Sequence, residues 1–234
     1  MAKEETVHRG DFIEIAFTGK VTDTGAVFDT TEKDIAEANE LNYRPEELGR
    51  KIICLGENHI LPGLEQALES STIGNEKTIL LAPDQAFGKK DASLMRLVST
   101  NHFRKEGIRP EPGMQVSIDG TLGIVKTISG ARTLVDMNNP LAGREVSYEI
   151  TIIRRVLDPA LQAAWTINNE FGFLPRVEAR KDPQKDPKGE LIIHVPPKFP
   201  PELRKTVTER VQKLIPQVSS ITVDESDEKT NNKV

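Results

Sequence analysis

The sequence predicts an α+β fold of three parts: a sheet with a short helix laid across it, a small β-rich module inserted into that sheet, and a C-terminal α-β-β-α-β domain. Residues 12–17 alternate as a half-buried strand does, and the segment after Pro62 repeats apolar residues at helical spacing. Beyond Pro159, two helical and three strand-like segments follow in the order of the C-terminal domain. These three observations predict the class.

Composition limits the classes of partner. The chain has 234 residues, a length that favours two or three domains. Hydrophobic residues make up 37% and charged residues 29%, which is typical of a soluble globular protein with a modest core. The formal net charge is −5, so no overall field favours nucleic acid or an anionic membrane. We expect neither partner.

The single cysteine and the N-terminal residues indicate where the protein works. Cys54 cannot form an intramolecular disulfide, and its apolar neighbours over 51–55 favour a small buried hydrophobe over a reactive thiol. Residues 1–11 are polar and lack the apolar core of a signal peptide. No run approaches 18 apolar residues. We expect a cytoplasmic protein without a membrane span.

A turn joins the first two predicted strands. Ile13, Ile15 and Phe17 share one face of the first strand, and a turn at 23–25 leads into a second strand over 26–28. Asp29, which follows directly, is predicted as a turn former or as a helix cap, and both interpretations remain open.

A polar excursion follows the second strand. Residues 32–39 permit a helix, which Thr30 or Thr31 would cap, and the excursion continues to Gly49. Long loops of this kind are often functional. Residues 51–55 then resume the sheet.

A helix and a loop form the centre of the predicted fold. Pro62 suits the first turn of a helix because its missing N–H has no partner there in any case. Leu64 and Leu68 place an apolar stripe on this helix. A strand over 77–82 and a loop ending at Phe87 complete a small apolar cavity.

The residues 89–136 predict the inserted module. Leu94, Leu97 and Val98 fall on one stripe of a predicted helix over 91–103. Three short strands then follow, and tight-turn signals at 119–120 and 129–130 join them. The predicted strands are 114–118, 123–128 and 132–135.

The remaining segments form a long strand and the C-terminal domain. Residues 146–156 alternate, with Tyr148 on the apolar face, and Asp158 is a plausible cap for the next helix. The tail 224–234 is polar and predicted to be disordered. The C-terminal domain is predicted to contain a helix at 160–168, strands at 176–179 and 191–195, a helix at 202–215, and a strand at 220–223.

No chemical motif points to a metal, a cofactor or covalent catalysis. No histidine has a second ligand at metal-binding spacing, so we expect no metal. Gly-rich phosphate loops, nucleophile elbows and Cys/His pairings are missing from the sequence. We therefore expect no cofactor. The sequence also lacks the nucleophile–base arrangement that a hydrolase needs. The histidines are His8, His59, His102 and His194.

What remains is a set of apolar residues with one carboxylate, Asp29, at the end of a strand. From periodicity alone these residues are better interpreted as core than as a site. They are Phe17, Phe28, Ile60, Leu61, Leu64, Phe87 and Tyr148.

Five motifs in one order change this interpretation. The chain carries FTGK at 17–20, VFDT at 27–30, ILPGLE at 60–65, AFG at 86–88 and NNPLAG at 138–143. With them it resembles an FKBP-type peptidyl-prolyl isomerase over about 8–157. The last motif and the inserted module resemble the SlyD-like branch, whose insert-in-flap domain binds unfolded chains. The excursion and the C-terminal domain resemble the long-type archaeal members.

The resemblance implies the FKBP fold, an antiparallel sheet wrapped around a short helix. The implied domains are an isomerase domain over 1–88 and 137–157, an insert-in-flap chaperone domain over 89–136, and a C-terminal domain over 158–223, with the tail 224–234. For the C-terminal domain, dimerisation through its second helix or an edge strand and a self-contained appendage remain alternatives.

The resemblance also implies a proline pocket. Phe87 and Phe17 stand where the family usually has tyrosine, and Asn139 stands where SlyD-like members often have histidine, whereas leucine at 64 is normal for that branch. The implied catalytic residues are Phe17, Asp29, Phe87 and Tyr148. The implied substrate-binding residues are Phe28, Ile60, Leu61, Leu64 and Leu141.

Such residues suffice for isomerisation. The X–Pro bond exchanges over roughly tens to hundreds of seconds across a barrier near ~20 kcal/mol, and no bond has to break. The twisted amide is less polar than the planar one, so an apolar pocket binds it preferentially. Backbone N–H groups near Ile60 and Leu61 would hold a substrate carbonyl, and Asp29 would orient the twisted one.

The expected partners are unfolded or proline-containing polypeptides, and the resemblance adds macrolide inhibitors. Apolar residues of the module would bind unfolded segments and raise the local concentration of prolines, unless they form its own core. A second hypothesis is a binding module with a degraded pocket that acts only as a holdase. The predicted binding residues are Leu94, Met95, Val98, Phe103 and Met114.

Overall fold

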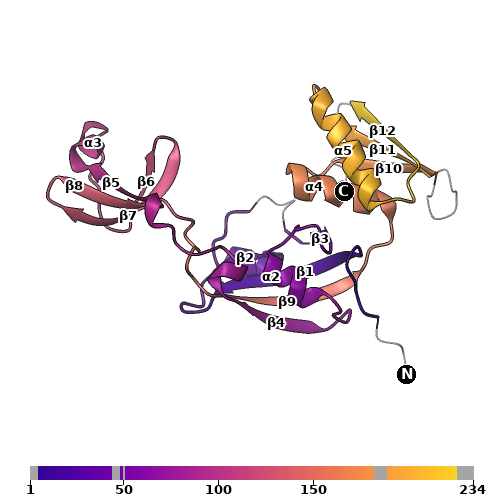
Figure 1. Ribbon diagram of the computed structural model, residues 1–234, viewed down its shortest axis with the longest axis horizontal. Coiled ribbons are helices and arrows are strands. Elements are labelled where there is room, and N and C mark those ends of the chain that lie inside the picture. Colours follow the sequence, from indigo (N-terminus) through magenta and orange to yellow (C-terminus); the bar gives the residue numbers. More distant parts are fainter. Residues whose placement is uncertain (1–4, 44–47, 50, 182–188, 226–234) are drawn as a thin grey trace. The chain divides into compact units, whose positions relative to one another are not determined.

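The computed structural model describes residues 5–43, 48–49, 51–181 and 189–225 (Figure 1). The chain divides into two compact units. The first unit consists of Met1–Lys20, Ala26–Leu80 and Ser147–Val234, and the second of Val21–Gly25 and Leu81–Val146. Of the predicted disordered tail 224–234, Asp224 and Glu225 belong to a strand, which corrects that part of the prediction, and the rest lies outside the described residues.

The first unit contains a five-stranded sheet with the order β2-β1-β9-β4, and β3 also pairs with β1. β1 runs antiparallel to both β2 and β3. The predicted strands are present, and β1 extends four residues further than its predicted end. The strands are β1 Phe12–Val21, β2 Val27–Thr30, β3 Lys51–Cys54, β4 Glu76–Leu81 and β9 Val146–Arg155.

Two helices accompany this sheet. Helix α2, Pro62–Leu68, begins at its proline as predicted and buries Leu64 and Leu68. Helix α1, Lys33–Ala38, has Glu32 as its N-cap and no side-chain cap. The predicted threonine cap is therefore wrong: Thr31 Oγ1 accepts from the N–H of Phe17, and Thr30 Oγ1 binds Thr18 and the N–H of Glu32, which precedes the helix.

The C-terminal residues 159–225, which belong to the first unit, follow the predicted α-β-β-α-β order. Asp158 Oδ1 accepts a 2.9 Å hydrogen bond from the N–H of Ala160 and so caps α4, Pro159–Phe171. Strands β10 Arg176–Lys181, β11 Glu190–Val195 and β12 Ser220–Glu225 form a sheet in that order, antiparallel between β10 and β11 and parallel between β11 and β12. Helix α5, Pro201–Leu214, connects the parallel pair (Figure 1).

One core joins this C-terminal sheet to the first sheet. Ile52 and Cys54 of β3 pack in the same buried cluster as Ala163 and Ile167 of α4. The cluster continues to Val211 of α5. Since each element buries its apolar side against the next, α4 is held directly against β3.

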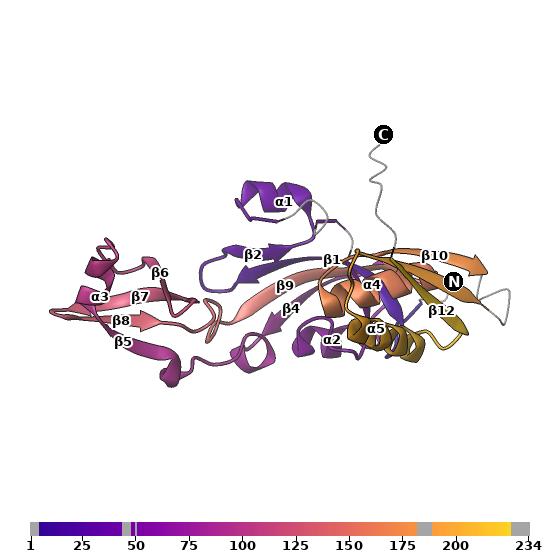
Figure 2. The same cartoon turned by 90° about the horizontal axis from the view of Figure 1, so that it is seen from above.

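The second unit contains a four-stranded antiparallel sheet in the order β5-β8-β7-β6, with a short helix, α3 Thr100–Lys105, next to β5 (Figure 2). The three predicted strands are present. The strands are β5 Met95–Ser99, β6 Gln115–Ile118, β7 Thr121–Ser129 and β8 Arg132–Asp136.

The predicted helix over 91–103 is wrong. A single 3₁₀ turn, η3 Ala92–Leu94, precedes β5, and helical structure resumes only at Thr100. Three apolar residues at helical spacing do not separate a helix from a strand, and here pairing of Leu97 with Leu134 of β8 decides. The outcome is a strand whose alternate residues face opposite sides.

This correction divides the predicted binding residues of the module. Phe103 is 1% exposed at the centre of the module's core, and Val98 packs against that core. Both are therefore core residues, which corrects their prediction as binding surface. Leu94 and Met114 are exposed, and Met95 is half-buried.

The opposite side of the same sheet carries the apolar outer face, defined by Met95, Leu97, Leu122 and Leu134. Leu97 lies directly opposite Leu134, and residues opposite one another share a face. Leu97 is 56% exposed and Leu122 is 61% exposed.

Among the described residues, no helix is long and apolar enough to cross a membrane.

Candidate active site

Three aromatic rings from three neighbouring strands form one wall of the site. The ring of Tyr148 lies 5.8 Å from that of Phe17, tilted by 56°, and 5.6 Å from that of Phe28, nearly perpendicular at 85°. Such edge-to-face contacts are favourable. A Cβ atom on Gly19 would lie 2.9 Å from both the Phe28 and Tyr148 rings, so this position requires glycine.

Tyr148 keeps its proton. Tyr148 is 3% exposed, and burial raises the pKa of its phenol. The nearby Asp29 and Tyr43 raise this pKa further. The neutral phenol leaves the aromatic wall uncharged.

Asp29 is held by a tyrosine that the sequence did not single out. The hydroxyl of Tyr43 donates a 2.7 Å hydrogen bond to Asp29 Oδ1, and it accepts a 3.2 Å bond from the N–H of Thr30. Asp29 lies inside β2, opposite Gly19, so it is neither a turn former nor a helix cap. The signal in the sequence was slight: Tyr43 is one of two tyrosines and lies in the polar excursion.

Threonine hydroxyls fix the end of β2 beside these groups. Thr31 Oγ1 accepts a 2.9 Å hydrogen bond from the N–H of Phe17, and Thr18 and Thr30 join their hydroxyls at 2.9 Å. All three threonines are buried. The backbone that carries Phe17 and Asp29 is therefore tied across the two strands.

The segment before α2 and the helix itself carry three of the predicted substrate-binding residues. The N–H of His59 donates a 3.1 Å hydrogen bond to Glu65 Oε1, which closes the turn over the intervening residues. Ile60 and Leu61 are half-buried in this turn, and Leu64 of α2 is 3% exposed.

Phe87 and Leu141 belong to the second unit. The N–H of Gly143 donates a 2.8 Å hydrogen bond to the carbonyl of Gly88, so the two loops that carry them are joined within that unit. Asn139 Oδ1 accepts a 2.8 Å hydrogen bond from the N–H of Leu141 and so forms a side-chain turn. The structure thus brings together Phe17, Phe28, Asp29 and Tyr148 and places these loop residues in a separate unit.

A cavity of about 550 Å³ opens beside Phe17 and Asp29. Its opposite wall comes from α4 and the residues that follow it: Trp165, Phe173 and Leu174. Sequence reasoning missed this wall, because nothing local in 165–174 indicates which strand α4 packs against. Phe28, Ile60, Leu61, Leu64 and Tyr148 are not among the residues that line this cavity.

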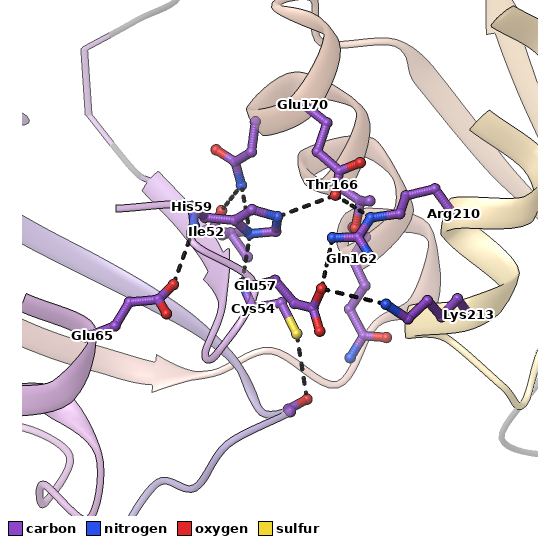
Figure 3. A network of polar contacts seen from close by, with 12 residues as sticks. Ile52, Cys54, Glu57, His59, Glu65, Gln162, Thr166, Glu170, Arg210 and Lys213 are labelled. Atoms are coloured by element: carbon purple, nitrogen blue, oxygen red, sulfur yellow. Dashed lines mark hydrogen bonds and ion pairs between the residues drawn. The ribbon is translucent and has the colours of Figure 1, made fainter. Parts of the chain in front are cut away.

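A polar network joins the turn at His59 to the C-terminal helices (Figure 3). His59 Nδ1 accepts a 3.1 Å hydrogen bond from the N–H of Cys54, so Nε2 carries the proton and faces Glu170 Oε1 at 3.4 Å. Arg210 of α5 donates to Glu170 at 2.5 Å and to Glu57 at 2.7 Å. The network therefore links both C-terminal helices to the entry of α2.

Burial and charge set the state of this network. Burial lowers the pKa of His59, although the hydrogen bond to Glu170 acts in the other direction. Burial would raise the pKa of Glu57, and its hydrogen bond to Arg210 turns the net shift downwards. At neutral pH the imidazole of His59 is therefore neutral and the carboxylate of Glu57 is charged.

The described residues at this site provide groups that bind a ligand. Within the described part of the chain, no group of three or more His, Cys, Asp or Glu residues is arranged to hold a metal ion. The groups at the site are aromatic rings, one oriented carboxylate and hydroxyls. This set can hold and orient an amide.

Comparison with known proteins agrees with this geometry. Residues 3–104 match the family described as FKBP-type peptidyl-prolyl cis-trans isomerase, and residues 96–141 match the family described as FKBP26, IF domain. The chain is 32% identical over 164 residues to the FKBP-type 16 kDa peptidyl-prolyl cis-trans isomerase of Escherichia coli strain K12, covering 68% of this chain and 99% of that protein.

Two further relatives extend the comparison. The short-type peptidyl-prolyl cis-trans isomerase of Methanocaldococcus jannaschii is 25% identical over 154 residues, which cover 66% of this chain and 96% of that protein. The FKBP-type peptidyl-prolyl cis-trans isomerase SlyD of Helicobacter pylori strain J99 is 32% identical over 107 residues, covering 42% of this chain and 55% of that protein.

Proposed function

Since this chain belongs to the FKBP-type peptidyl-prolyl cis-trans isomerases and is an enzyme of that class, we propose that it accelerates X–Pro isomerisation in unfolded polypeptides, which it holds through its inserted module. The observation that carries the proposal is the aromatic wall of Phe17, Phe28 and Tyr148 beside the oriented carboxylate of Asp29.

The proposed mechanism follows from the electronic structure of the amide. Rotation removes the conjugation of the amide, so the twisted state is less polar and gains from the uncharged aromatic wall. Asp29, held by Tyr43, faces the rotating group and orients it. Each tenfold acceleration needs only about 1.4 kcal/mol of preferential binding, so a few such contacts suffice.

The apolar outer face supports the holding role of the module. Leu97 and Leu122 are more than half exposed, and Leu94 and Met114 add exposed apolar surface in the same unit. Exposed apolar patches mark sites of interaction with other chains. An unfolded polypeptide bound there would present its prolines at a higher effective concentration.

The test separates holding from catalysis. The double variant Leu97→Ser and Leu122→Ser should leave isomerisation of a proline tetrapeptide unchanged and should slow proline-limited refolding of a protein substrate about tenfold. The matched control is Leu80→Ser with Leu161→Ser, which removes two exposed leucines of the first unit. Equal loss on both substrates, or no loss on the protein substrate, would contradict the holding role.

The second candidate function is a holdase with a weak pocket. It is favoured by Phe17 and Phe87, which stand where the family usually has tyrosine. Wild type and Asp29→Ala distinguish the two functions in an NMR exchange assay on a proline peptide. A holdase would show the same exchange rate for both proteins, whereas an isomerase would lose most of its rate in the variant.

The length of the chain supports placement among the long-type, archaeal members of the SlyD-like branch. The alignment with the short-type relative covers 96% of that protein but 66% of this chain, which leaves room for a further domain. We place the protein in the cytoplasm, and macrolide inhibitors are proposed ligands of the same pocket.

A homodimer through the C-terminal domain is proposed because β12 is an edge strand and Leu203 of α5 is exposed. Sedimentation of the full chain and of Leu203→Glu would test it. The full chain is preferable to a chain cut at Leu157, because the cut would expose Ile52 and Cys54 of the shared core.

A further inference from the structure

We propose that the C-terminal domain completes the substrate site: the cavity between Phe17 and α4 binds residues of the polypeptide substrate that lie beyond the tetrapeptide core around the proline. This inference rests on the isomerase function proposed above. It assigns to α4 and the residues that follow it a role in substrate selection.

Continuity with the proline site identifies the occupant. Phe17 and Asp29 line the cavity and also belong to the aromatic wall and its carboxylate. A polypeptide whose proline lies against that wall must continue past it in at least one direction. The volume of about 550 Å³ lies within the range of ligand sites and exceeds the needs of one proline ring.

The opposite wall has the chemistry of a peptide subsite. Trp165 and Phe173 are half-buried, and Leu174 is 46% exposed, so three large apolar side chains are available to a flanking side chain. Asn168 adds an amide that can donate to and accept from a peptide backbone. We therefore expect apolar or aromatic residues just beyond this tetrapeptide core to be preferred.

The wall is held in a defined place. Asn169 Nδ2 donates a 2.8 Å hydrogen bond to the carbonyl of Ile52, which ties α4 to β3. The helix ends at Gly172, whose φ of +77° reverses the chain and brings the next two residues to the cavity. Arg210 adds its bridge between Glu170 and Glu57.

The charged groups of the cavity carry opposite signs. Lys51 Nζ lies 5.8 Å from the centre of the Phe17 ring, and Asp29 lies in the same lining. A neutral peptide segment, with its own carbonyl and N–H groups, matches this pair better than an ion of either sign.

Trp165 is the only tryptophan in the chain, so its emission reports on this cavity. The full chain is titrated with a proline tetrapeptide and with a longer peptide that extends the same core with apolar residues on both sides of the proline. We expect the longer peptide to shift the Trp165 emission and the tetrapeptide to leave it nearly unchanged. No shift with the longer peptide would overturn the proposal.

A pair of leucine variants tests the same wall by kinetics. Leu174→Ser should raise KM for the longer peptide about fivefold, with kcat unchanged, and should leave the tetrapeptide unaffected. Leu161→Ser is the matched control, because it removes an exposed leucine of α4 that does not line the cavity. Equal effects of Leu174→Ser on both peptides, or equal effects of the two variants, would also overturn the proposal.

The two readouts separate this inference from the isomerase function. An emission shift without isomerisation of either peptide would retain the subsite and contradict the proposed catalysis. Isomerisation of both peptides with no emission shift and no effect of Leu174→Ser would retain the catalysis and contradict the subsite.

Discussion

The hydroxyl of Tyr43 lies 2.7 Å from Oδ1 of Asp29 and donates a hydrogen bond to it. The hydroxyl oxygen of Tyr43 also accepts a hydrogen bond from the N–H of Thr30, the next residue of β2. A residue from the polar excursion thus orients the one carboxylate of the site. Phe17 has no hydroxyl that could bind Asp29, and Tyr43 makes the hydrogen bond to Asp29 from another element.

Removing that hydroxyl should weaken catalysis. Tyr43→Phe keeps the ring and deletes the donor, so Asp29 loses its orientation, and we expect kcat/KM to fall about fivefold to tenfold. NMR exchange on a proline tetrapeptide measures this change. Thermal unfolding of the variant serves as the control, and an unchanged kcat/KM would show that Asp29 is held without Tyr43.

Phe87→Tyr should act in the opposite direction. The family usually has tyrosine at this position, and its hydroxyl would give the substrate a further hydrogen bond, which is worth on the order of 1 kcal/mol. We expect turnover to rise about fivefold in the same exchange assay. Turnover equal to that of the wild type would mean that the missing hydroxyl does not limit the rate.

His59 should remain neutral at mildly acidic pH. Burial lowers its pKa below the usual 6.5, while Glu170 raises it, so Glu170→Gln should lower the pKa further. NMR titration of the His59 ring in the full chain checks both shifts. Glu209→Gln, on the exposed side of α5, is the matched control.

The stability of the folded protein should depend on pH because the pKa of His59 is lowered. Below pH 6.5 the unfolded chain binds a proton at His59, whereas the folded chain binds it only at lower pH. The contribution of His59 to the free energy of unfolding is therefore complete above pH 6.5 and is lost as the pH falls through the folded pKa. A titration midpoint above 6.5 would reverse this sign.

Cys54 should be unreactive in the folded protein. Burial raises its pKa to about 12, and the nearby carboxylate of Glu57 contributes. Against the usual 9.0, the thiolate fraction is about a thousandfold smaller at mildly alkaline pH. A chromogenic disulfide reagent should report one thiol only after addition of guanidinium chloride, and rapid reaction of the native protein would contradict the buried assignment.

The sequence predicted the first sheet well because its signals are local. Alternation over 12–17 and 146–156 placed β1 and β9, and Pro62 marked the start of α2. The motifs also singled out Phe17 and Asp29, which the structure brings together. Periodicity failed over 91–103, where the contact that decides, Leu97 with Leu134, spans 37 residues.

The sequence by itself determined which residues alternate, where helices begin, and which motifs occur in which order. These features depend on neighbours within a few positions along the chain. Only the tertiary structure decided that Tyr43 reaches Asp29 and that α4 sets Trp165 beside Phe17. Those contacts depend on which apolar faces pack together, as Ile52 of β3 does with Ile167 of α4, and no local pattern specifies that choice.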